Sequence, residues 1–169
     1  CALPIFQLLK VAGCGKIIAV DIEPEKLDFA LKVGADSGLN PKETNVPARV
    51  FELTKDRGAD IAFEVVGVGD AVNCAIESVR KGGTVTLVGN TAPRIDFPLQ
   101  WVVTRELKLQ GSCSIRGEFE AVLDLLGRGV IDTRVILSAV APLSEGAQWF
   151  ERLYRKEKGL MKVILKPGA

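Results

Sequence analysis

One acidic residue directly follows a short apolar run near the start of the chain. The run over 17–20 (IIAV) is continuously apolar, which is typical of a parallel strand covered by helices on both faces. Asp21 comes next, and Pro24 suits the first turn of a helix. In doubly wound folds, a carboxylate between a strand end and a helix start binds the hydroxyls of an adenosine ribose. The alternative is a solvated carboxylate that interacts only with the helix dipole.

Two further predicted strands end in glycine. The strand over 61–66 runs into Val66 and Gly67, and the strand over 84–88 runs into Val88, Gly89 and Asn90. Parallel strands present their carboxyl ends at one edge of the sheet, where ligands bind in open α/β folds. Glycine there lets the backbone approach a flat ring or a ribose closely, although a glycine after a strand is more often only a turn. Together with the acidic residue, these turns indicate a nucleotide site.

The composition limits the chemistry that this chain can perform alone. The 169 residues include no histidine, and the cysteines are scattered, at Cys1, Cys14, Cys74 and Cys113. A histidine base and a clustered metal site are therefore excluded. The net charge of +1 argues against a nucleic-acid or membrane partner, and no apolar run approaches the ~18 residues of a membrane span. No signal segment opens the chain, so we expect a cytoplasmic protein with free thiols.

The remaining pattern alternates strands with helices, which predicts an α/β fold with a Rossmann-like, doubly wound parallel sheet. The expected strands cover 17–20, 37–40, 61–66, 84–88, 107–111 and 162–165. The expected helices cover 6–12, 24–33, 46–54, 71–79, 99–104, 119–126 and 144–154, the last one opened by Ser144.

The chain begins inside the first helix of this pattern. We therefore expect a fold truncated at the amino end, without its first strand and its glycine-rich turn. Residues 1–5 supply neither a cap nor a strand, and we interpret them as a non-native artefact preceding a nucleotide-binding domain over 6–169. The first strand would lie at the centre of the sheet, so the strands over 17–20 and 61–66 should face each other across a gap or pair in a non-native way.

Five ordered segments carry a specific resemblance. The runs KIIAVDIEPEKLDFALKVGAD, GADIAFEVVG, KGGTVTLVGN, RELKLQGSCS and GLMKVILKP resemble the cofactor domain of the medium-chain zinc-dependent alcohol and polyol dehydrogenases, most closely the sorbitol and threonine dehydrogenase-like branch. The resemblance implies that residues 6–169 are the NAD-binding Rossmann domain of an oxidoreductase. Such an enzyme moves hydride between a secondary alcohol, such as the polyol sorbitol, and NAD. It also implies a homo-oligomeric enzyme.

The resemblance assigns several residues to the adenosine and phosphate side of NAD. Asp21 matches the carboxylate that binds both ribose hydroxyls, and Lys26 matches a lysine that reaches the same ribose. Val66 and Gly67 match residues that line the adenine and the ribose. Lys162 resembles a cationic residue near the pyrophosphate, although a lysine beside a final strand can equally be a solvated flank.

The resemblance also assigns two segments to the nicotinamide side. Val88, Gly89 and Asn90 match residues along the nicotinamide half, and Gly111, Ser112 and Cys113 resemble the backbone stretch that meets the carboxamide. The family's zinc ligands have no counterpart here, so zinc would be bound by residues outside this chain. No catalytic or metal-binding residue is therefore expected in it.

Two alternatives belong to other functional classes. A methyltransferase also places an acid after its second strand, but it would finish with an antiparallel hairpin, and RELKLQGSC has no place in it. A non-catalytic nucleotide-binding module would have the same sheet edge without a zinc domain. Both the nucleotide-binding module and a SAM-dependent methyltransferase stay open as alternatives from the residues alone.

Overall fold

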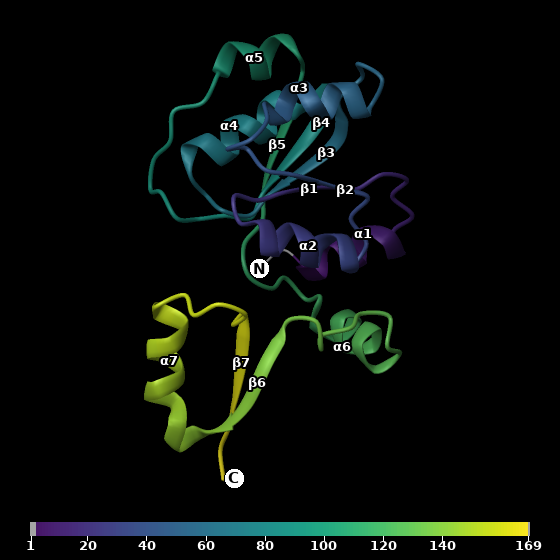
Figure 1. Cartoon of the computed structure of the whole chain (residues 1–169). Helices are drawn as coiled ribbons and strands as arrows, with labels where there is room; N and C mark the ends of the chain where they lie inside the picture. Colours follow the sequence, from purple (N-terminus) through teal and green to yellow (C-terminus); the bar gives the residue numbers. More distant parts are fainter. Residues whose placement is uncertain (1–2, 169) are drawn as a thin grey trace.

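The computed structural model describes residues 3–168 and contains three sheets, each built of parallel strands (Figure 1). In the first, β1 (Ile18–Val20) pairs with β2 (Ser37–Leu39). The second has β4 (Val79–Leu87) between β3 (Ala59–Glu64) and β5 (Lys108–Gly111), and the third pairs β6 (Leu137–Pro142) with β7 (Lys162–Lys166). The predicted α/β fold with parallel strands is confirmed. The antiparallel hairpin expected of a methyltransferase is not found within these residues.

Helices connect the paired strands, which is what makes parallel pairing possible. The connections are α2 (Pro24–Lys32), α4 (Gly69–Ser78), α5 (Leu99–Thr104) and, between β6 and β7, the 3₁₀ turn η1 (Leu143–Glu145) with α7 (Gly146–Tyr154). The other helices are α1 (Leu3–Val11), α3 (Val46–Leu53) between β2 and β3, and α6 (Phe119–Gly127) after β5. Leu3 to Ile5, within the segment interpreted as an artefact, belong to α1, and residues 1–2 lie outside the described residues.

Local signals explain where the helices begin and end. Pro24 occupies the first turn of α2, as predicted, and Gly34 follows the helix with a φ of +119° that L-residues rarely adopt. The side chain of Asn45 caps α3 by accepting a hydrogen bond from the backbone N–H of Ala48 at 3.0 Å. These signals determine where α2 ends before β2 and where α3 begins after β2.

The helix α3 bridges the first two sheets. Its buried Val46 and Val50 pack with Leu39 of β2, and Ala59 of β3 packs against the same cluster. Separate cores lie under α1 and α2, around Ile17, Ala19, Ala30 and Ala35, and under α4, around Val72, Ile76, Val79 and Val85. The relative position of the two sheets therefore depends on the packing of α3.

The strands β1 and β3 belong to different sheets, and no strand within residues 3–168 pairs the two sheets directly. Of the two predicted outcomes, the non-native pairing of β1 with β3 is thus not found in the described part of the chain, and the width of the gap stays a prediction. Each of the two strands has a parallel neighbour on only one side among the described residues, β2 for β1 and β4 for β3.

The sequence interpretation missed one strand at the carboxyl end. The strand β6 was not predicted, whereas the predicted closing strand over 162–165 is β7, which pairs with β6. Ser144 does not cap the last helix, because it lies inside η1, while Glu145 occupies the cap position of α7. The third sheet and α7 lie apart from the other two sheets (Figure 1). That residues 6–169 form one NAD-binding domain stays a prediction.

Long-range hydrogen bonds tie the carboxyl-terminal part to α1 and α2. The side-chain amide of Gln7 donates to the carbonyl of Asp132 at 3.0 Å and accepts from its N–H at 2.7 Å. Lys158 forms an ion pair with Glu25 at 2.6 Å, and Met161 packs against the core under α1.

Candidate functional site

Asp21 lies at the carboxyl end of β1, where the strand turns into α2. Its backbone N–H donates to the carbonyl of Leu39 at 3.3 Å, which continues the pairing of β1 with β2. Its carboxylate oxygen Oδ1 accepts from the N–H of Glu23 at 3.0 Å, and among residues 3–168 no cation forms an ion pair with it. A carboxylate has about four acceptor positions, so this turn fixes the group and leaves acceptors for a ligand.

Lys26 lies in the first turn of α2, close to Asp21 in sequence. Its ammonium nitrogen is 3.0 Å from a carboxylate oxygen of Glu23, and both side chains are about half exposed. The structure therefore pairs Lys26 with Glu23 and not with Asp21. Surface pairs of this kind contribute about 0 to 1 kcal/mol, so Lys26 is free to change partner when an anion is near.

The turns after β3 and β4 are joined to each other by hydrogen bonds. The carbonyl of Glu64 accepts from the N–H groups of Val88 and Gly89 at 2.8 and 3.0 Å. In the same direction, the hydroxyl of Thr91 donates to the carbonyl of Val66 at 2.6 Å, and the N–H of Ala92 donates to the carbonyl of Gly67 at 2.8 Å. Residues 66–67 and 88–92 thus form one continuous backbone surface, which we call the double turn.

The two glycines of the double turn have no room for a side chain. A Cβ atom added to Gly67 would lie closer than 3.0 Å to backbone atoms of Gly89, Asn90 and Thr91, and its φ of +79° also favours glycine. A Cβ atom added to Gly89 would come equally close to backbone atoms of Val66 and Gly67. The structure therefore brings together the predicted residues Val66, Gly67, Val88, Gly89 and Asn90.

Glu64 is a site residue that sequence reasoning missed. It ends β3, is only 4% exposed, and accepts hydrogen bonds from the N–H groups of Val66 and Gly67. The signal was present, because a carboxylate inside an apolar strand needs a buried partner. In the sequence it lies three residues before the glycine of the turn.

The end of β5 lies beside the double turn. Gly111 pairs with Leu87 in the last register position of β4 and β5, and the N–H of Ser112 donates to the carbonyl of Leu87 at 2.9 Å. Ser112 and Cys113 are exposed, and Cys113 is a free thiol. The carboxyl ends of β3, β4 and β5 therefore meet at one edge, as expected of a parallel sheet.

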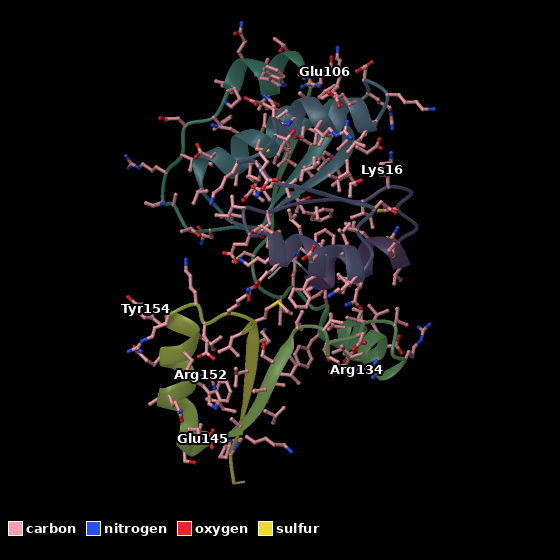
Figure 2. All side chains as sticks on the ribbon, in the orientation of Figure 1. Lys16, Glu106, Arg134, Glu145, Arg152 and Tyr154 are labelled. Atoms are coloured by element: carbon pink, nitrogen blue, oxygen red, sulfur yellow. The ribbon has the colours of Figure 1, made fainter. Side chains whose placement is uncertain are left out.

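Lys162 lies elsewhere, at the start of β7 in the third sheet. It lines a groove of about 640 Å³ together with apolar residues and Arg134, which Figure 2 shows beside α6. The guanidinium of Arg134 is paired with Asp132 at 2.9 Å, an interaction that lowers the pKa of the Asp132 carboxyl. No hydrogen bond or ion pair of the described residues joins Lys162 to Asp21 or to the double turn. Its predicted role near a pyrophosphate stays a prediction.

The described residues offer no metal site. Among residues 3–168, no group of three or more histidine, cysteine, aspartate or glutamate side chains is placed to hold an ion. The described cysteines Cys14, Cys74 and Cys113 are free, and burial raises the pKa of the Cys74 thiol. Within the same part of the chain, no helix has both the length and the apolar character needed to cross a membrane.

Known proteins resemble the chain over nearly its whole length. A probable D-xylulose reductase A of Emericella nidulans is 30% identical over 165 residues, which are 95% of this chain and 46% of that protein. Sorbitol dehydrogenase of Bacillus subtilis is 28% identical, over 94% of this chain and 45% of that protein. The structure of the alcohol dehydrogenase TADH from Thermus sp. ATN1 matches with a TM-score of 0.88 and 34% identity, over 96% of this chain and 46% of that one.

These matches confirm the resemblance to zinc-dependent alcohol and polyol dehydrogenases. The chain spans about half the length of the relatives that it matches. The model of one family, described as zinc-binding dehydrogenase, matches residues 3–128. Since this match includes most of the chain, the protein belongs to the zinc-binding dehydrogenase family.

Proposed function

We propose that this chain is the NAD-binding part of a zinc-dependent dehydrogenase that transfers hydride between a secondary alcohol of the polyol class and the nicotinamide. The observation that carries the proposal is the Asp21 carboxylate, held by the N–H of Glu23 at the end of β1 with acceptor positions left over. The double turn supplies the second half of the site. It is a glycine-lined backbone surface that a flat ring or a ribose can approach closely.

The charge at Asp21 favours NAD over NADP. The carboxylate accepts hydrogen bonds from two free ribose hydroxyls, whereas it repels a 2′-phosphate. The residues that follow it, Ile22 and Glu23, supply no arginine to bind such a phosphate. Lys26 can reach the ribose by exchanging its exposed partner Glu23.

The substrate and the metal belong to the whole enzyme. The relatives include a sorbitol dehydrogenase and a xylulose reductase, which support a polyol substrate. Zinc, bound by residues outside this chain, would polarise the alcohol oxygen and lower its pKa. In this chain, the stretch Gly111, Ser112 and Cys113 would meet the carboxamide, and Lys162 would be the cation near the pyrophosphate. We further propose that the enzyme is cytoplasmic, in keeping with its free thiols, and a homo-oligomer.

Calorimetric titration with NAD and NADP tests the proposal through Asp21→Ala. Hydrogen bonds to a charged group contribute about 1.5 to 3 kcal/mol, so the Kd for NAD should rise roughly 10- to 150-fold, while binding of NADP should improve relative to NAD. Asp28→Ala is the matched control, because Asp28 is an exposed acid on α2, outside the turn after β1. Unchanged affinity for both cofactors in Asp21→Ala would refute the assignment.

A further inference from the structure

Glu64 is the only charged side chain that is buried among residues 3–168. A buried carboxylate is costly unless its acceptor positions are filled. No lysine or arginine of the described residues forms an ion pair with it, and its partners are instead backbone N–H groups. Oxygen Oε1 accepts from Val66 at 2.7 Å and from Gly67 at 2.9 Å, and Oε2 lies 3.1 Å from the nitrogen of Gly67.

The same residue also holds the neighbouring turn. Its backbone carbonyl accepts from the N–H groups of Val88 and Gly89. The side chain of Glu64 thus binds the turn that follows its own strand, and its main chain binds the turn that follows β4. One residue contacts both halves of the double turn.

The backbone polar groups of Val66 and Gly67 all have hydrogen-bond partners within the protein. The N–H groups of Val66 and Gly67 point to the carboxylate, and their carbonyls are occupied by Thr91 and Ala92. A turn whose polar groups are all satisfied has little freedom left to lose when a ligand packs on it. Binding to such a preorganised surface costs less conformational entropy.

We propose that Glu64 is a positioning residue for the cofactor: its buried carboxylate holds the Val66–Gly67 peptide in the conformation on which the adenosine half of NAD packs. This inference rests on the proposed function. Glu64 does not touch the cofactor itself, and it acts through the N–H groups of the double turn. A glutamine would keep the size of the side chain but would turn one acceptor into a donor, which faces another donor in the turn.

The test combines amide exchange, NAD affinity and urea unfolding in Glu64→Gln, Glu64→Asp and the control Glu106→Gln. Glu106 is exposed and forms an ion pair with Lys81, away from the double turn, so its change should alter nothing at the site. In Glu64→Gln, we expect the Val66 and Gly67 amides to exchange about tenfold faster, and the Kd for NAD to rise about tenfold, because neutral hydrogen bonds are about half as strong as charged ones. The urea midpoint should fall as well, because the weakened hydrogen bonds belong to the folded state, so the NAD affinity is compared after correction for the folded fraction.

The aspartate variant separates positioning from bulk stability. Aspartate side chains commonly accept from the N–H two residues further on, so Glu64→Asp should restore most of the amide protection and of the NAD affinity. The proposal is overturned if Glu64→Gln leaves both quantities unchanged, or if affinity falls only as far as the folded fraction does. If the wild-type protein does not bind NAD, the proposed function fails, and exchange at Val66 and Gly67 then decides on the role of Glu64 in the turn alone.

Discussion

The closest backbone approach in the candidate site leads to a sharp prediction for Gly89→Ala. The added methyl group would lie closer than 3.0 Å to backbone atoms of Val66 and Gly67, which cannot rotate away as a side chain can. To reach an ordinary carbon contact, the two turns must separate by about 1 Å. That movement breaks the hydrogen bonds across the contact, which run from Gly89 to Glu64, from Thr91 to Val66 and from Ala92 to Gly67.

Three such bonds at about 0.5 to 1.5 kcal/mol each give an expected loss of about 1.5 to 4.5 kcal/mol in the free energy of unfolding. Against a usual domain stability of about 5 to 15 kcal/mol, this loss is large enough to measure by urea unfolding followed through tryptophan fluorescence. NAD affinity should fall with it, because the double turn is part of the proposed site.

Gly111→Ala is the matched control. Gly111 also ends a strand of the second sheet, but a Cβ atom added there meets nothing within 4 Å. We expect its stability to stay within about 0.5 kcal/mol of the wild type. Equal unfolding midpoints for the alanine variants of Gly89 and Gly111 would show that the backbone approach is not tight, and the reasoning would be refuted.

Two further predictions concern charge and metal. Asp36 accepts from the N–H of Ile17 at 2.7 Å and pairs with Lys10, which lowers the pKa of its carboxyl in the folded protein. Its stabilising effect should therefore be full above the unfolded pKa of about 3.9 and disappear as the pH falls through the lower folded value. Asp36→Asn should thus reduce the urea midpoint at pH 7 and flatten its acid dependence, and an unchanged profile would contradict this. Because the chain contains no histidine, the 169 residues supplied with NAD and zinc should oxidise no polyol, and zinc-dependent reduction of NAD in a spectrophotometric assay would contradict that expectation.

Elements with strong local signals were predicted closely from the sequence. The apolar run before Asp21 became β1, and the expected short strand over 37–40 became β2 (Ser37–Leu39). Pro24 marked the start of α2, because its ring fits the first helical turn and breaks an interior one. In each case the residues that determine the element lie inside it or next to it.

The strand β6 shows where local patterns fail. Its sequence, LSAVAP, is rich in alanine and ends in proline, both of which are depleted in strands. Five of its six residues are exposed or only half buried, so the strand carries no strong apolar signal. The strand exists because β7, more than twenty residues later, pairs with it, and neither segment alone carries that information.

The double turn was predicted as separate glycine-containing turns, and its geometry was not. Gly67 and Gly89 are 22 positions apart in the sequence, and nothing in either segment shows that their backbones touch. The contact depends on the register of β3 and β4, which pairs Glu64 with Leu87 and so places both turns at the same level. Register is a property of the folded sheet, set by the burial of one face of each strand.

The candidate site is divided between two sheets. Asp21 ends β1, whereas the double turn follows β3 and β4, and no strand pairing connects them within residues 3–168. Their separation is set instead by α3, whose Val46 and Val50 pack between Leu39 of β2 and Ala59 of β3. A ligand that contacts both Asp21 and the double turn therefore depends on buried side chains that it never touches. The sequence identifies the two halves of such a site. The distance between them depends on the packing of α3, which belongs to neither half.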